Sequence, residues 1–312
     1  MSTPNSATAV LLMAYGSPET AADVAPYYTH IRGGQRPPEE RIKELEARYV
    51  FVGGKTPLRA LTNAQAAGLQ RLLDERAGVG RFQVFVGMKH WHPFIKQALD
   101  EIRQGGTRDV IAIALAPHFS KMSIGGYEKA LAEDGYGLSI RIVKSWHTNK
   151  HLIDCIVTQI NAALAADDGR RPHIVFTAHS LPKRIRQWSD PYEEQLLETC
   201  RLVAGRLPGY DWSFSFQSAG HTADPWLGPD IAEALADLKA KGTRDVLLCP
   251  IGFVADHLEI LFDLDKGAKG TAESLGMRLS RVESRNSHPL FIEALYDLVR
   301  GGVADEVKLA TG

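Results

Sequence analysis

The chain has 312 residues and a mass of 34.3 kDa, a length that suits two domains of roughly 150 residues each. Its 36 Lys and Arg residues nearly balance its 37 Asp and Glu residues. The net charge of -1 excludes a general polyanion binder, because nucleic-acid binding of that kind needs a basic excess. With 44% hydrophobic and 23% charged residues the composition is that of a globular protein, which excludes the disordered, collagen-like and coiled-coil classes.

Apolar runs alternate with helix-like segments along the chain, the pattern of parallel sheets covered by helices. The first run, AVLLMA at residues 9–14, is continuously apolar, as in a strand buried on both faces. The same pattern predicts strands at 9–14, 82–86, 110–116, 174–177, 212–216 and 246–251. Helical patterns are found at 94–103, 230–240 and 289–299.

Three pairs of segments recur in the same order, which predicts an internal duplication. AVLLMAYGSP at 9–18 echoes HIVFTAHSLP at 173–182, and GTRDV at 106–110 is repeated letter for letter at 242–246. A strand, a loop and a helix precede each GTRDV copy. We therefore predict an α/β fold of two Rossmann-like halves, each a parallel sheet flanked by helices. The expected boundaries are 1–145 and 146–285 for the halves and 286–312 for a C-terminal helix that packs back on the body.

The three cysteines and the ends of the chain bear on its compartment. Cys155, Cys200 and Cys249 are too far apart for a metal knuckle, and with no cysteine after position 249 we expect no C-terminal iron–sulfur cluster. The first nine residues lack the basic and apolar regions of a signal peptide. The longest clean apolar run, at 110–116, is far shorter than the ~20 residues that span a bilayer. We expect a soluble cytoplasmic protein that binds neither nucleic acid nor membrane.

Ligands of open parallel sheets bind beyond the carboxyl ends of the strands. Tyr15 follows the first strand, and His179 occupies the matching position in the second half. A lone histidine at a strand end more often only bonds to backbone, so the function of His179 depends on a partner. The segment FVADHLEILFD at 253–263 offers Glu259 for this role.

The acidic residues of the 253–263 segment predict a helix with one acidic face. Asp256, Glu259 and Asp263 have helical spacing, and Leu258, Leu261 and Phe262 can take the buried side. Acidic residues at a helix start often only pair with the helix dipole, which fits Asp256 better than the two deeper carboxylates. His179 with Glu259 would form a mixed imidazole and carboxylate site for Fe²⁺, Zn²⁺ or Mn²⁺. Two protein ligands hold a metal weakly, as suits a site that passes its metal on.

A further pair of segments is suited to a flat anionic ligand. YYTHIRGG at 27–34 and RYVFVGGKTP at 48–57 place arginine, tyrosine and hydroxyl groups beside paired glycines. Arginine can bind carboxylates bidentately and stack on aromatic rings. Paired glycines by themselves more often only form turns.

Taken together, these segments resemble the ferrochelatases, which insert Fe²⁺ into a porphyrin. The matching pieces are MAYGSP at 13–18, YYTHIRGG at 27–34, GGKTPL at 53–58, APHFS at 116–120, TAHSLP at 177–182, PWLGP at 225–229 and GFVADHLEILFD at 252–263. The chain is most similar to the soluble bacterial coproporphyrin III ferrochelatases, and the apolar lip of the protoporphyrin branch is not visible. The four propionates of coproporphyrin reward arginine and hydroxyl contacts, whereas protoporphyrin favours an apolar entrance.

The resemblance implies Fe²⁺ insertion into coproporphyrin III in haem biosynthesis, with iron as substrate and no permanently bound cofactor. It implies that His179 and Glu259 are catalytic and bind the metal, that Tyr15 is an axial ligand to iron in the product, and that Asp263 assists delivery. The residues it assigns to the porphyrin are Tyr15, Arg32, Arg48, Tyr49, Thr56 and Tyr127. An outer metal site of some relatives would use Arg48, Asp263 and a further acid, but that last position is Gly267 here.

Other readings stay open at this point. One is a protoporphyrin IX ferrochelatase, and another is a chelatase for a different tetrapyrrole, which typically uses a pair of histidines. A non-catalytic two-lobed binding protein is a third, although such proteins are usually exported. From the family alone, we also expect a monomer with transient contact to a coproheme decarboxylase.

Overall fold

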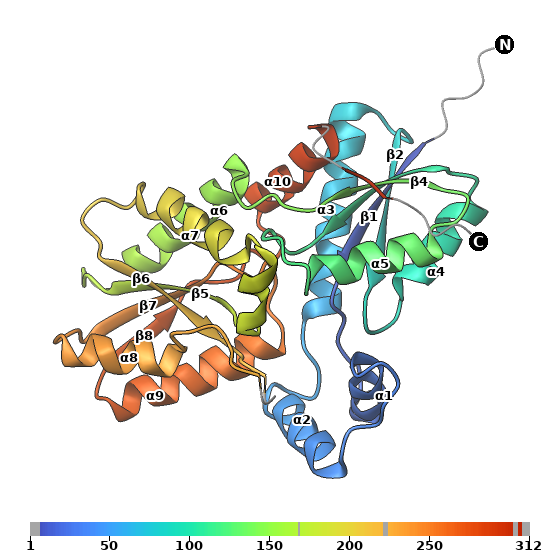
Figure 1. Cartoon of the computed structure of the whole chain (residues 1–312). Helices are drawn as coiled ribbons and strands as arrows, with labels where there is room; N and C mark the ends of the chain where they lie inside the picture. Colours follow the sequence, from blue (N-terminus) through green and yellow to red (C-terminus); the bar gives the residue numbers. More distant parts are fainter. Residues whose placement is uncertain (1–6, 168, 221–223, 302–304, 308–312) are drawn as a thin grey trace.

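The computed structural model describes residues 7–167, 169–220, 224–301 and 305–307, and shows two parallel sheets flanked by helices (Figure 1). In the first sheet the parallel strands lie in the order β2-β1-β3-β4, and in the second in the order β6-β5-β7-β8. The first sheet comprises β1 (Thr8–Ala14), β2 (Phe82–Met88), β3 (Asp109–Ala114) and β4 (Ser139–Val143). The second comprises β5 (His173–His179), β6 (Trp212–Gln217), β7 (Asp245–Pro250) and β8 (Arg278–Arg281). The predicted fold of two similar halves is confirmed.

Helices connect the strands of both sheets, and two of them stand apart from the body. In the first half they are α1 (Ala21–Ile31), α2 (Glu39–Phe51), α3 (Leu58–Ala77), α4 (Ile95–Gln104) and α5 (Ile124–Asp134). Those that follow are α6 (Lys150–Ala165), the 3₁₀ helix η1 (Lys183–Trp188), α7 (Tyr192–Ala204), α8 (Ile231–Ala240), the π-helix η2 (Glu259–Ala268), α9 (Lys269–Ser274) and α10 (Pro289–Arg300). Helices α1 and α2 lie between β1 and α3 in sequence and project beyond the first sheet (Figure 1).

One hydrophobic core is shared by both halves. Strand side chains point alternately to opposite faces, and in β1 Val10 and Leu12 face this shared core while Leu11 and Met13 face a second core under α4 and α5. The shared core continues through α3, α6 and α10 to Phe176 of β5. Because apolar packing is continuous across the two sheets, the halves are held in one arrangement that fixes the site between them.

The strands β4 and β8, which sequence patterning did not reveal, lie on the outer side of β3 and β7 in each sheet. Both alternate: Ser139 and Arg278 are exposed, and Ile140 and Ile142 are buried. A strand that is solvated on one face lacks the continuous apolar run that marks the central strands.

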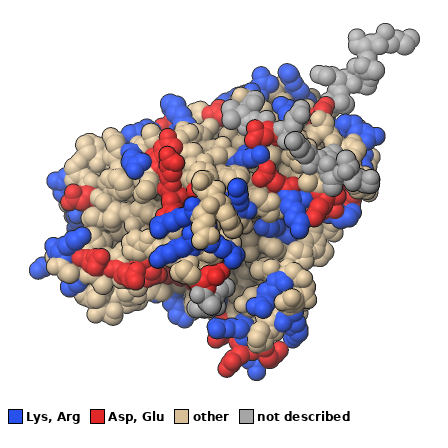
Figure 2. Space-filling view, viewed as in Figure 1, with Lys and Arg blue, Asp and Glu red and all other residues tan. Residues whose placement is uncertain are grey.

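The chain returns to the first half at its end. Helix α10 packs against α3 and α6, and the short strand β9 (Asp305–Glu306) pairs antiparallel with β4. Within the described ranges, no helix is both long and apolar enough to cross a bilayer. Acidic and basic side chains are interspersed over the face seen in Figure 2, without one continuous basic surface.

Candidate active site

His179 is the last residue of β5, at the carboxyl edge of the second sheet. The buried run before it pairs with β6 and β7, and the register ends at His179 opposite Gln217. The Ser180 N–H donates to the Gln217 carbonyl at 2.7 Å, and the Tyr192 hydroxyl donates to the His179 carbonyl at 3.0 Å. The strand end is therefore held from two sides, and the imidazole projects from a fixed backbone.

Glu259 begins the π-helix η2, which follows β7. A π-helix has hydrogen bonds from residue i to i+5, so its turn is wider than that of an α-helix and residues four apart come nearly into line. Its buried residues are Ile260, Leu264 and Ala268, so the prediction that Leu258, Leu261 and Phe262 form the buried side is wrong. The wider turn is the physical reason.

Glu259 and Asp263 share a face of this helix, but Asp256 does not belong to it. Asp256 precedes the helix, and its carboxylate accepts hydrogen bonds from Ser284 and Asn286. The predicted acidic stripe of three residues therefore consists of two, Glu259 and Asp263.

The carboxylate of Glu259 lies between two imidazoles. His179 Nε2 is 3.4 Å from Glu259 Oε1, and His257 Nε2 is 3.5 Å from Glu259 Oε2. Both rings donate their Nδ1–H to backbone, His179 to the Ser180 carbonyl and His257 to the Ala255 carbonyl at 3.0 Å. With Nδ1 committed in each ring, any further proton must sit on Nε2, directly beside the carboxylate.

The charges of this pair reinforce each other. Burial alone would raise the pKa of the Glu259 carboxyl, but His179 and then His257 outweigh burial and hold that pKa well below its usual range. Burial would lower the pKa of His179, and the Glu259 charge reverses this and raises it. A proton on His179 Nε2 is thus stabilised, while Glu259 stays ionised and can bind a cation.

Asp263 extends the site toward α2 of the first half. Its carboxylate accepts a hydrogen bond from Ser218, which directly follows β6, and lies 3.8 Å from Arg48 Nη1. Burial and the Glu259 charge raise the pKa of Asp263, against the opposing hydrogen bond from Ser218. The Arg48 guanidinium also lies 5.2 Å from the Phe262 ring centre, so it contacts two residues of η2.

Gly267 lies one further π-turn along the face of Glu259 and Asp263. It is exposed and offers no ligand, and the neighbouring Lys266 ammonium lies 4.2 Å from the Phe51 ring centre and 4.7 Å from that of Phe262. A shallow pocket of about 280 Å³ here is lined by Glu44, Ala47, Arg48, Phe262 and Lys266. Of the two cations in this pocket, Arg48 lies beside the carboxylate of Asp263, and Lys266 lies over the aromatic rings.

Tyr15 follows β1 and approaches the second half from the opposite side. It is 46% exposed, yet the atoms around it desolvate the phenol, and this burial, followed by the charge of Glu259, raises its pKa. The centre of its ring lies 4.5 Å from that of His90, with the ring planes tilted by 52°, and His90 Nδ1 lies 3.1 Å from His30 Nδ1. The charge of Glu259 therefore reaches the phenol of Tyr15 across the two halves.

The remaining residues assigned to the porphyrin occupy different settings. The Tyr49 and Thr56 hydroxyls are buried and lie 3.2 and 2.8 Å from Ser17 Oγ. Tyr127 is buried in α5 under Lys89, whose ammonium is 5.3 Å from the ring centre. Arg32 caps the C-terminal end of α1 and is exposed, outside this cluster of contacts.

Three contacts of the site were not predicted, namely His257 with Glu259, Ser218 with Asp263 and His90 with Tyr15. All three polar residues follow strands at the carboxyl edge, which was the available signal. Among the described residues no three His, Cys, Asp or Glu side chains converge on one point where a metal ion could bind. His179 lies beside Oε1 of Glu259 and His257 beside Oε2, so the two imidazoles contact different oxygens of the carboxylate. The three cysteines are buried, with free thiols.

This geometry defines a class: two Rossmann-like halves with an imidazole–carboxylate pair from one half opposite a tyrosine of the other. Solved structures share the fold. SirB from Bacillus subtilis with Fe³⁺ superposes with a TM-score of 0.59 at 12% identity, over 94% of both chains. CbiX, described as the terminal enzyme for siroheme biosynthesis in denitrifying bacteria, has a TM-score of 0.57 at 14% identity, over 94% of this chain and 98% of that one.

The sequence model of the ferrochelatase family matches residues 7–302, and the chain belongs to this family. A ferrochelatase of Herpetosiphon aurantiacus is 43% identical, over 94% of this chain and 98% of its own length. A coproporphyrin III ferrochelatase of Bacillus subtilis is 37% identical, over 93% and 96%. The protein is an enzyme of porphyrin biosynthesis that inserts metal into the macrocycle, as its sequence motifs predicted.

Proposed function

We propose that this ferrochelatase inserts Fe²⁺ into coproporphyrin III and forms coproheme. The observation that carries the proposal is the Glu259 carboxylate held between His179 and His257, whose charge also raises the pKa of Tyr15 from the other half. Relatives named coproporphyrin III ferrochelatase, such as the Bacillus subtilis enzyme, support the choice of porphyrin.

In this proposal the two pyrrole protons leave one at a time through His179, which passes the first to solvent before it accepts the second. Its Nδ1–H is committed to the Ser180 carbonyl, so the Nε2 lone pair accepts the proton, and the adjacent Glu259 carboxylate stabilises the imidazolium that results. Glu259 then has two tasks, to compensate that charge and to bind the incoming Fe²⁺ through its oxygens. Asp263, on the same face of η2, would pass the metal to Glu259.

Tyr15 would contact the iron from the opposite face of the ring. Burial and the Glu259 charge raise the pKa of its phenol, so Tyr15 would carry a neutral hydroxyl before the metal is inserted. The propionates would lie toward the projecting α1 and α2, where Arg32 is exposed and Arg48 is partly exposed. Binding energy from these ends of the porphyrin can bend the ring and expose its nitrogen lone pairs, at a cost of ~1–5 kcal/mol.

The test of substrate is a competition without oxygen. The purified chain is mixed with Fe²⁺ and either coproporphyrin III or protoporphyrin IX, and the metalloporphyrin bands are followed. We expect kcat/KM to be higher for coproporphyrin by at least about tenfold, or ~1.4 kcal/mol. Equal or reversed values would assign the chain to protoporphyrin IX, and metallation of neither by iron would favour a chelatase for another metal and tetrapyrrole.

Variants test the assigned roles against matched controls. His179→Ala should abolish insertion and leave porphyrin binding within about twofold, whereas His151→Ala, which removes a partly exposed histidine paired with Asp297, should retain activity. Arg48→Ala should weaken coproporphyrin binding, and Arg41→Ala on the same helix should not, since Arg41 pairs with Glu44. Insertion by His179→Ala at near the wild-type rate would remove the proposed proton acceptor.

The remaining sequence expectations belong to the same proposal. Cytoplasmic location, a monomeric state, the lack of a permanently bound cofactor and transient transfer of coproheme to a decarboxylase are consistent with an enzyme whose metal and porphyrin are both substrates. Of these expectations, the monomeric state can be measured directly, by sedimentation of the purified chain alone and with coproheme.

A further inference from the structure

The π-helix that carries Glu259 is unusually long. All ten residues of η2 have π geometry, whereas π-helices occur mostly as single turns inside α-helices. Buried Ile260, Leu264 and Ala268 hold its inner side against the second sheet. Glu259 is its first residue and has no helical turn before it, so the direction of its carboxylate depends on what holds the chain on either side.

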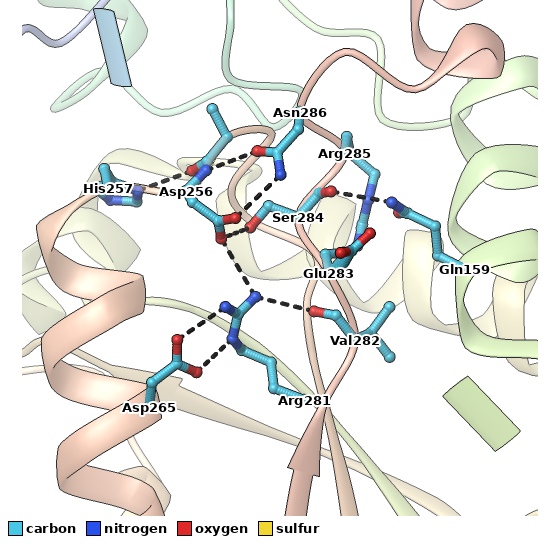
Figure 3. A network of polar contacts seen from close by, with 11 residues as sticks. Gln159, Asp256, His257, Asp265, Arg281, Val282, Glu283, Ser284, Arg285 and Asn286 are labelled. Atoms are coloured by element: carbon cyan, nitrogen blue, oxygen red, sulfur yellow. Dashed lines mark hydrogen bonds and ion pairs between the residues drawn. The ribbon is translucent and has the colours of Figure 1, made fainter. Parts of the chain in front are cut away.

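One guanidinium contacts both sides of Glu259. Arg281, the last residue of β8, forms a two-pronged ion pair with Asp265 in the middle of η2, through Nε at 2.6 Å and Nη2 at 2.9 Å. Its Nη1 lies 3.3 Å from the carboxylate of Asp256, which precedes the helix (Figure 3). The side chains of Arg281 and Asp256 are 14% and 18% exposed, so the contact between them is largely shielded from water.

Asp256 is in turn fixed by the segment that follows β8. Ser284 donates to Asp256 Oδ1 at 2.7 Å, Asn286 Nδ2 donates to Oδ2 at 3.0 Å, and the Asp256 N–H donates to Asn286 Oδ1 (Figure 3). The Asn286 carbonyl accepts a hydrogen bond from Gln65 of α3 at 2.8 Å. The start of the catalytic helix is thereby connected to the first half of the protein.

This network acts on the position of Glu259 rather than on its charge. The groups that lower the pKa of Glu259 are His179 and His257, and Arg281 is not among them. Two carboxylates already face the Arg281 guanidinium. We propose that Arg281 is a positioning residue that holds Glu259 opposite His179 by fixing the chain on both sides of it, an inference that rests on the proposed role of Glu259.

The first test compares two arginines of the same strand. Arg281→Met removes the network, and the control Arg278→Met removes an exposed ion pair with Asp245 at the other end of β8. We expect Arg281→Met to lower kcat by at least about tenfold, because a displacement of ~1 Å can cost a factor of a hundred. Porphyrin binding, followed by fluorescence, should stay within about twofold, and Arg278→Met should match wild type in both measurements.

Two further variants separate position from charge and from folding. Arg281→Lys keeps the charge but cannot reach Asp256 and Asp265 together, so it should recover only part of the activity; full recovery would overturn the proposal. Asp265→Asn keeps the arginine and weakens its ion pair with η2. It should show the same loss of kcat, so it provides the test if Arg281→Met does not fold. In a Glu259→Gln background, Arg281→Met should lower the residual rate by less than about twofold. An undiminished loss there would show that Arg281 does not act through Glu259.

A porphyrin-free measurement keeps this test separate from the proposed function. Co²⁺ alone is titrated into each variant, and the visible bands of the bound ion report its ligands. We expect Arg281→Met to weaken Co²⁺ binding about as much as Glu259→Gln does, and Arg278→Met to leave it unchanged. If Arg281→Met binds Co²⁺ like wild type, the positioning role is wrong, whichever porphyrin the enzyme uses. If wild type inserts iron into neither porphyrin, the proposed function fails while the Co²⁺ result still decides on Arg281.

Discussion

Gly252 packs where any side chain would push on the end of β5 that carries His179. It follows β7, and its N–H donates to the Thr177 carbonyl of β5 at 3.3 Å. A Cβ at this position would lie 2.7 Å from the Cβ and 3.0 Å from the Cα of Ala178, the residue before His179. Non-bonded carbons pack at about 3.5–4.0 Å, so Gly252→Ala must move the ends of β5 and β7 apart by ~1 Å.

Both stability and activity should respond to this displacement. Overpacking of a tight core site costs about 1–3 kcal/mol of unfolding free energy. Since His179 is attached to the displaced strand end and Glu259 to the segment after β7, the 3.4 Å contact between them should open. A misplacement of ~1 Å can reduce the rate about a hundredfold. We therefore expect Gly252→Ala to lose much more activity than its stability loss explains.

The measurement is the initial rate of metal insertion, together with urea unfolding of the same preparations. The matched control is Gly270→Ala in α9, where a Cβ meets no atom within 4 Å; it should keep full activity and be as stable as wild type or more so, because alanine is the better helix former. Wild-type activity in Gly252→Ala would refute the reasoning, since it would mean that the strand ends move without disturbing the pair. Equal losses in both variants would refute it as well.

Three further outcomes follow from the site and its surroundings. The pKa of His179 is raised, so the contact of its protonated ring with Glu259 stabilises the fold below about pH 6.5, and this stabilisation is lost as pH rises through the raised pKa. Glu259→Gln should remove this pH dependence of stability and lower the pKa of His179, measured by an NMR titration of its ring. Ser17→Ala leaves the buried Tyr49 and Thr56 hydroxyls without their common partner and should cost about 1–3 kcal/mol in urea unfolding, whereas Thr56→Ser, which keeps the hydroxyl, should cost about 1 kcal/mol or less. Burial raises the pKa of all three cysteine thiols, so a thiol reagent should modify none of them in the native protein and all three after unfolding; fast native labelling would contradict their burial.

The sequence predicted those parts of the fold that depend on burial and repetition. The central strands are continuous apolar runs, and the repeated segments placed His179 where Tyr15 stands in the first half, as the structure confirms for both strand ends. The edge strands β4 and β8 carry no such run, so periodicity could not separate them from loops. Patterning therefore finds the centre of each sheet more readily than its margin.

The candidate site was predicted in its composition but not in its contacts. An i, i+3, i+7 spacing indicates one face only if all three residues lie on the helix. The helix η2 begins at Glu259, so Asp263 shares its face with Glu259, while Asp256 precedes the helix and contacts Arg281. Nothing in the local sequence signals this, because it depends on residues after β8 that are distant in the chain. The same holds for Tyr49 and Thr56, whose buried hydroxyls meet only through Ser17 of another loop.

The return of the chain to its first sheet bears on how the protein is made. The outer edge of β4 is covered by β9, and α3 of the first half is covered by α10, and both of these elements are translated after the whole second half. At about 5–20 residues per second, the first half stays uncovered on the ribosome for on the order of ten seconds, with an open strand edge. Synthesis rate and chaperone supply should therefore affect the yield of this enzyme more than its final stability suggests.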